Sequence, residues 1–139
     1  MTTTNPFDGT DYAWLAQDHA GHVGIFTVNA HGSVPAALHD ADLDAHETAL
    51  AAWIRARGLE SRRGSNPDIV AAADAAAAGI FAYDGSRDTY HYEVKARPER
   101  PILHADLPEE LRAISFVRLP VDFATADVIE AATITGVGL

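Results

Sequence analysis

Apolar and polar positions divide residues 12–28 into two short hydrophobic segments with a polar segment between them. Residues 12–17 and 23–28 are rich in aromatic and β-branched side chains. The five residues that separate them, DHAGH, contain the Asp and Gly that turns favour. This pattern predicts a β-hairpin.

A helical pattern follows over residues 43–57. Its apolar positions fall on one stripe, formed by Leu43, Leu50, Trp53 and Ile54. Asp44 and Glu47 have the spacing of an N-terminal capping box, and Gly58 is typical of a helix end. We expect a helix from about residue 43 to residue 57.

A second helix is predicted from the alanine-rich segment that ends at Gly79. Asn66 is a natural N-cap, and Pro67 suits the first helical position. Alanine side chains bury little apolar area, so Ile69 and Val70 are expected to anchor this helix.

Alternation returns in residues 79–97, which predict a second hairpin around the turn DGSRD. Tyr90, Tyr92 and Val94 alternate with His91, Glu93 and Lys95, so that one face is apolar. Farther on, LPEEL predicts a single helical turn, residues 113–123 at least one strand, and residues 126–134 either a weak strand or a short helix.

These elements predict one α+β domain over residues 1–139. We expect an antiparallel sheet built from the two hairpins and the C-terminal strand or strands, with the two main helices packed on one side. The length of 139 residues suits a single core, and 47% hydrophobic and 22% charged residues are ordinary for a globular protein.

The distribution of charged residues says more about function than the overall composition does. Ten Lys and Arg stand against 20 Asp and Glu, which gives a formal net charge of −10. Residues 1–54 contain no Lys or Arg but seven acids: Asp8, Asp11, Asp18, Asp40, Asp42, Asp44 and Glu47. Such a field repels nucleic acid and speeds the encounter with a basic partner, and solubility is the alternative explanation of the same charge. These seven are the candidate partner-binding residues.

The expected location is the cytoplasm. The chain has no cysteine for disulfides, its first residues lack the basic and apolar parts of a secretory signal, and no apolar run approaches the roughly 20 residues that span a bilayer. We therefore expect no membrane association. The sequence leaves the oligomeric state open.

Metal and catalytic signatures are weak. His19 and His22 are three positions apart in a predicted turn, where we expect exposed histidines rather than ligands. Residues 40–51 begin like a calcium-binding loop, but Ala45 and Ala51 replace the required Gly and Glu. With no Cys, no GxSxG motif and no phosphate-binding loop, we predict no cofactor, no metal and no enzymatic activity.

The segment WLAQDHAGHVGIFTVNAHGSVP, from Trp14 to Pro35, is similar to small bacterial proteins that resemble the immunity proteins of polymorphic toxin systems. The matching positions are Trp14, Asp18, Gly21, Val23, Phe26, Gly32 and Pro35. The resemblance implies a cytosolic inhibitor whose carboxylates face the cationic cleft of a toxin domain. Two alternatives stay open: a small enzyme with a pocket lined by His and Asp, and an adaptor module with no toxin partner.

Overall fold

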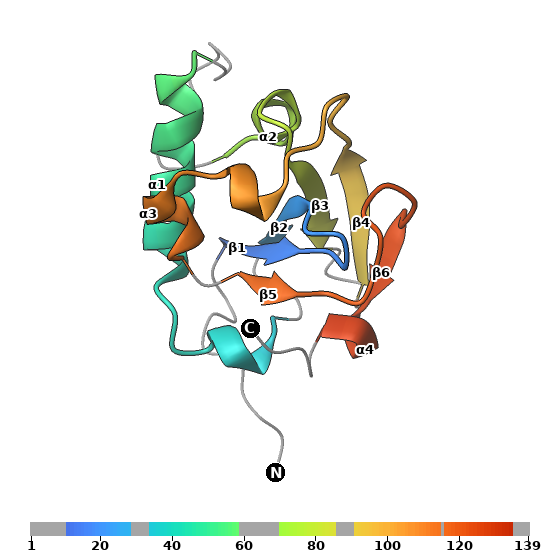
Figure 1. The fold of residues 1–139 in the computed structure, drawn as a ribbon. Helices are drawn as coiled ribbons and strands as arrows, with labels where there is room; N and C mark the ends of the chain where they lie inside the picture. The colour runs from blue at the N-terminus through green and yellow to red at the C-terminus, as the bar shows by residue number, and fades with distance from the viewer. Residues whose placement is uncertain (1–10, 29–33, 59–69, 86–90, 115, 135–139) are drawn as a thin grey trace.

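The fold is mixed α and β in a computed structural model that describes residues 11–28, 34–58, 70–85, 91–114 and 116–134 (Figure 1). The strands are β1 (Tyr12–Gln17), β2 (Val23–Val28), β3 (Phe81–Gly85), β4 (His91–Ala96), β5 (Val117–Arg118) and β6 (Val128–Glu130). The α-helices are α1 (Leu43–Ala56), α2 (Ala72–Ala77), α3 (Glu109–Arg112) and α4 (Ala131–Ile134), and two 3₁₀ turns cover η1 (Ala36–Leu38) and η2 (His104–Asp106). The predicted α+β class is confirmed.

The strands form one curled sheet in the order β5-β1-β2-β3-β4-β6. Strand β1 pairs antiparallel with β2, and β4 pairs antiparallel with both β3 and β6. The β2–β3 and β1–β5 pairs are parallel. The prediction of an antiparallel sheet is therefore wrong at these two pairs. Between β2 and β3 the reason is that α1 and α2 lie in a crossover that returns the chain in the same direction.

Helix α1 is confirmed close to its predicted bounds, but the predicted capping box is wrong. The N-cap is Asp42, whose carboxylate accepts a hydrogen bond from the backbone N–H of Ala45 at 3.1 Å. Glu47 lies on the buried side of the helix with Leu43 and Leu50. Its position follows from the helical period, since residues four and three apart share one face.

The second helix starts later than the sequence predicts. Residues 70 and 71 precede α2, and Ala71 has an extended backbone with φ −73° and ψ 149°. The predicted cap at Asn66 and Pro67 lies outside the described residues. The predicted end at Gly79 is confirmed, because its φ is +91° and a Cβ there would meet the carbonyl oxygen of Arg100 at 2.8 Å.

The two faces of the sheet bury different kinds of side chain. One face carries an aromatic cluster, in which Trp14 and Phe26 stack at 4.2 Å and Phe26 and Tyr83 at 4.9 Å. The other face carries smaller aliphatic residues, which pack with residues of α1 and α2, among them Leu50 and Ala75. Both faces of the central strands are thus excluded from water, so the sheet is the interior of the molecule.

The C-terminal part combines several short elements. Helix α3 is the single turn that LPEEL predicts, and residues 128–134 form both of the alternatives considered, a short strand β6 and then the helical turn α4. The segment between β5 and β6 passes beside the β1–β2 turn. Among the described residues, every helix is too short or too polar to cross a lipid bilayer.

Candidate functional site

Three of the predicted partner-binding residues lie together at the start of α1. Asp40, Asp42 and Asp44 are all exposed, and they occupy the last residues before the helix and its first turn. Among the described residues, Lys95 pairs with Asp84 and Arg97 pairs with Asp127, and no ion pair joins a lysine or arginine to these three carboxylates. We call these three residues the α1 acidic surface. Its charge is available to a partner.

Two other predicted partner residues point into the protein. Glu47 is buried, and its Oε2 accepts a hydrogen bond from the backbone N–H of Val70 at 3.0 Å. This bond ties α1 to the segment that leads into α2. Asp18 is only 3% exposed. Both are therefore removed from the surface that the sequence suggested, Asp11 remains as an exposed residue before β1, and Asp8 lies outside the described residues.

Asp18 organises the turn between β1 and β2. Its Oδ1 accepts hydrogen bonds from the backbone N–H groups of Ala20 and His22, each at 2.9 Å. Gly21 completes the turn with a φ of +91°, which L side chains rarely adopt. An Asp at the first position of a turn commonly binds backbone groups just ahead of it, so local geometry explains this residue.

The other oxygen of Asp18 reaches a distant segment. Oδ2 accepts a hydrogen bond from the backbone N–H of Phe123 at 3.0 Å, and the N–H of His19 donates to the carbonyl of Val121 at 3.1 Å. The β1–β2 turn is thereby fixed to the segment between β5 and β6. Burial raises the pKa of Asp18, but the hydrogen bonds from Phe123, His22 and Ala20 outweigh it, so that its pKa lies below the ordinary value.

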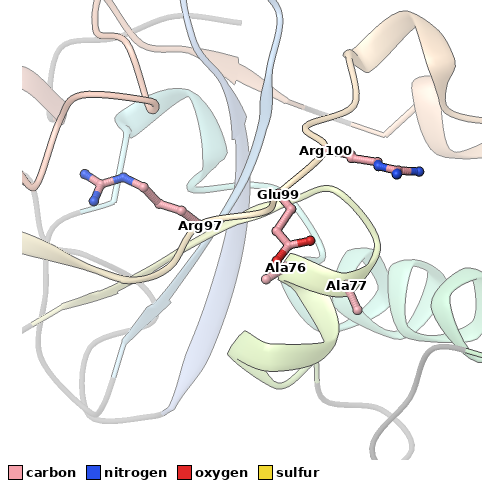
Figure 2. A pocket seen from close by; sticks show the side chains of 5 residues that line it. All are labelled: Ala76, Ala77, Arg97, Glu99 and Arg100. Atoms are coloured by element: carbon pink, nitrogen blue, oxygen red, sulfur yellow. The ribbon is translucent and has the colours of Figure 1, made fainter.

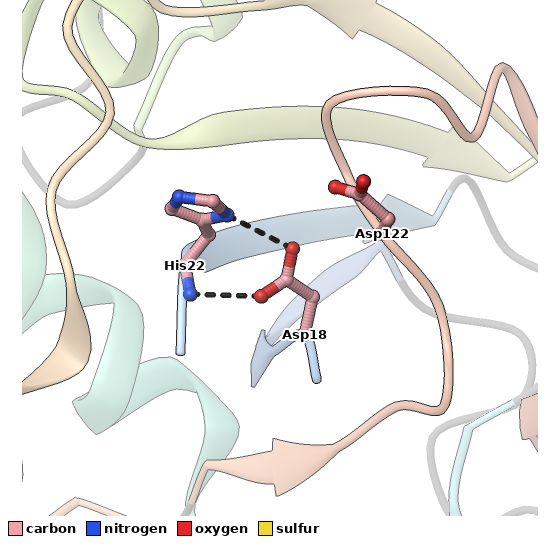
Figure 3. A group of neighbouring side chains, drawn as sticks. All are labelled: Asp18, His22 and Asp122. Carbon is pink, nitrogen blue, oxygen red and sulfur yellow. Dashed lines mark hydrogen bonds and ion pairs between the residues drawn. The ribbon is translucent and has the colours of Figure 1, made fainter. Parts of the chain in front are cut away.

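A cluster of three potential ligands forms where these segments meet (Figure 3). His22 Nδ1 lies 3.1 Å from Asp18 Oδ2, and one carboxylate oxygen of Asp122 completes a group whose atoms lie within 4.8 Å of one another. Figure 3 shows the Asp122 carboxylate directed toward the other two side chains. The Asp18 side chain is fully buried and that of His22 is 25% exposed, so the cluster is reached from solvent on the His22 side.

The two histidines of the turn differ. His19 is exposed, as predicted, and takes no part in the cluster. His22 is half-buried beside Phe81, with ring centroids 5.8 Å apart. The prediction that both are exposed turn residues is wrong for His22, because the hydrogen bond to Asp18 turns its ring toward the protein.

Cavities also lie elsewhere on the surface of the described residues. One, of about 320 Å³, is bounded by the end of α2 and by Arg97, Glu99 and Arg100. Figure 2 shows the two arginines directed to opposite sides, so they do not converge on an anion.

The second cavity has a volume of about 420 Å³, and Thr27, Asp84 and Lys95 supply its polar groups. The hydroxyl of Thr27 donates to Asp84 Oδ1 at 3.2 Å, so part of this polar lining is already hydrogen-bonded. Neither cavity has a histidine among its described lining residues. The His/Asp-lined pocket expected of a small enzyme is therefore not formed by them.

Asp122 is the residue that the sequence analysis missed. It is far from the turn in sequence, and the hydrogen bonds from the Phe123 N–H to the Asp18 carboxylate and from the His19 N–H to the Val121 carbonyl bring it there. The turn chemistry of Asp18 and the helical spacing of Glu47 were visible in the sequence and indicate structural roles for both. Comparison of the chain with protein-family models, curated proteins and solved structures gives no match.

Proposed function

We propose that the protein binds a basic protein partner through the α1 acidic surface, and that it acts as a cytosolic immunity-type inhibitor of a toxin domain. The observation that carries the proposal is the grouping of Asp40, Asp42 and Asp44, three exposed carboxylates within five residues. Unpaired charge of one sign on a surface accelerates the encounter with a partner of the opposite sign.

The chemistry of such a partner follows from the charge. A toxin domain that cleaves nucleic acid holds phosphates with Lys and Arg, and its cleft is therefore cationic. Carboxylates at the α1 acidic surface would occupy the same positions as the phosphates. A net charge of −10 adds a long-range attraction toward this kind of partner and a repulsion from nucleic acid itself.

The proposed interface depends on charge more than on aromatic anchors. Trp14 is fully buried in the core, and Trp53 is half-buried with the guanidinium of Arg57 4.7 Å above its ring. Neither tryptophan offers a free aromatic surface next to the three carboxylates. Association should therefore be strongly sensitive to salt, because exposed charges are screened over about 8 Å at physiological ionic strength.

The test uses the product of a toxin-like reading frame adjacent to the gene. Asp40, Asp42 and Asp44 are replaced together by Asn, which keeps the size of each side chain and the N-cap at residue 42. The control replaces the exposed Glu109, Glu110 and Glu130 by Gln and removes the same net charge. Binding kinetics are measured at low and high salt, together with the growth of cells that produce both proteins.

We expect the Asp-to-Asn variant to lower the association rate constant at low salt by about tenfold and the control to change it much less. Cells that rely on the variant should lose protection against the toxin. An unchanged association rate at low salt, or an equal loss in the control, would exclude the α1 acidic surface as the interface. No binding and no protection with the unaltered chain would reject the inhibitor function itself.

A further inference from the structure

The cluster of Asp18, His22 and Asp122 combines the donor atoms of a metal site. One imidazole nitrogen and two carboxylate oxygens lie within 4.8 Å of one another. They come from two segments about 100 positions apart in sequence, which are held together in part by the hydrogen bond of 3.0 Å from the backbone N–H of Phe123 to Asp18 Oδ2. Imidazole and carboxylate are ligands that divalent transition metals accept in proteins.

The charges of the cluster are suited to a cation. Two carboxylates face each other, and among the described residues no Lys or Arg forms an ion pair with either of them. The backbone N–H groups on Asp18 and the N–H of Ala124, which donates to Asp122 Oδ1 at 2.9 Å, supply only partial positive charge. A bound divalent cation would place a full positive charge beside the two carboxylates, which the backbone groups do not supply.

The ligands are already held in place. Three backbone N–H groups orient the Asp18 carboxylate, and one does so for Asp122. Metal-binding carboxylates in proteins are usually fixed by hydrogen bonds of this kind, which lower the cost of ordering the site. The partial exposure of His22 and Asp122 leaves a path for an ion and for water molecules as further ligands.

We propose that Asp18, His22 and Asp122 bind one divalent transition-metal ion of the Zn²⁺ or Mn²⁺ class. The 3.1 Å separation of His22 Nδ1 and Asp18 Oδ2 fits two ligands on one metal, because bonds of about 2.1 Å then enclose an angle of about 95°. The neutral imidazole of His22 carries its proton on Nε2 in the bound state. Nδ1 then coordinates the metal through its lone pair, and the hydrogen bond between Nδ1 and Asp18 Oδ2 is replaced by the two metal bonds.

This site is independent of the proposed function, since none of its residues belongs to the α1 acidic surface. The test measures Zn²⁺ and Mn²⁺ binding to the full chain by calorimetry in a buffer that does not chelate metals. The variants are Asp122→Asn, which keeps an oxygen for the Ala124 N–H, and His22→Ala. The control is His19→Ala, which removes an exposed histidine from the same turn. Circular dichroism without metal establishes that each variant is folded.

We expect one ion per chain for at least one of the two metals. Asp122→Asn and His22→Ala should each weaken binding by at least about tenfold, the loss typical even of residues that only support a ligand, and His19→Ala should have no comparable effect. The NMR signals of the His22 ring should change over the same range of metal concentration as the calorimetric titration. Absence of binding by both metals, or binding that either His22→Ala or Asp122→Asn leaves unchanged, would overturn the proposal.

Discussion

The described acidic residues of the first third of the chain fall into a buried group and an exposed group. Asp18 and Glu47 are buried and accept backbone hydrogen bonds, from Phe123 and Val70 respectively among others. Asp40, Asp42 and Asp44 are exposed. The comparison teaches that an excess of acidic residues in a sequence is not the same as an acidic surface, because some carboxylates connect segments inside the fold.

The two groups differ in what surrounds their carboxylates, which is protein hydrogen-bond donors in one group and water in the other. A buried carboxylate loses its hydration, and this loss is tolerated only where several donors converge on it. Asp18 has three backbone donors and the ring of His22. The exposed carboxylates stay hydrated. They contribute to the electrostatic potential around the protein and do not hold segments of the fold together. Stability measurements should therefore separate the groups clearly.

The largest effect is expected from Asp18→Ala. The substitution leaves the N–H of Phe123 without its acceptor in a buried position and releases the β1–β2 turn from the segment between β5 and β6. Loss of charge-assisted hydrogen bonds at a buried site should cost about 3 to 5 kcal/mol of unfolding free energy. Urea denaturation measures the change.

The matched control for Asp18 is Asp11→Ala, an exposed aspartate just before β1. It should change the unfolding free energy by less than about 0.5 kcal/mol, as is usual for surface substitutions. Equal effects of the two substitutions would contradict the structural role of Asp18. If Asp18→Ala does not fold at all, Asp18→Asn provides the smaller perturbation, because it keeps the volume and one acceptor oxygen.

The pH dependence of stability should carry the signature of the same residue. The pKa of Asp18 lies below its ordinary value of 3.8 in the folded state. A carboxylate with a lowered pKa stabilises the fold above its unfolded pKa, and this stabilisation disappears as the pH falls through the folded pKa. The difference in unfolding free energy between the unaltered chain and Asp18→Asn should stay constant from pH 7 to about pH 5 and shrink below about pH 4. A difference that grows on acidification would contradict the assignment.

A smaller effect is expected from Glu47→Ala. Glu47 Oε2 is the acceptor for the N–H of buried Val70, and an unsatisfied buried donor costs about 1 to 3 kcal/mol. We expect a loss of about 2 kcal/mol in urea denaturation. Thr48→Ala, at the next and exposed position of α1, serves as the control for helix propensity. A loss no greater than that of the control would place Glu47 outside the framework of the fold.

Local patterns account for what the sequence could predict. The period of α1, the single turn of α3 and the end of α2 at Gly79 are properties of neighbouring residues, and they were predicted. The parallel pairing of β2 with β3 depends on a crossover of about 50 residues, and no local period encodes a sheet neighbour. The two helices between these strands were nevertheless a signal for a parallel pair.

The candidate site was also hard to predict, because it depends on contacts between segments far apart in sequence. Asp122 approaches Asp18 and His22 because two segments about 100 residues apart are joined by hydrogen bonds, one to the Asp18 carboxylate and one between backbone groups. Spacing along the chain therefore drew attention to His19 and His22, of which only His22 belongs to the cluster. The burial of Glu47 could have been predicted from the sequence, since residues 43, 47, 50 and 54 share one helical face.

The smallest effect on stability is expected from the Asp40→Asn, Asp42→Asn and Asp44→Asn triple variant. Asn caps a helix about as well as Asp, so the hydrogen bond to the Ala45 N–H survives. Removal of the Asp44 charge from the first turn weakens the interaction with the helix dipole, whereas a less negative chain repels itself less. These effects oppose each other, and we expect a net change within about 0.5 kcal/mol in urea denaturation at low salt.

The remaining difference should vanish at high salt, since both effects are screened. A loss of more than about 1.5 kcal/mol, or one that salt leaves unchanged, would assign these carboxylates to the framework of the fold alongside Asp18 and remove the physical basis for a surface that meets a basic partner.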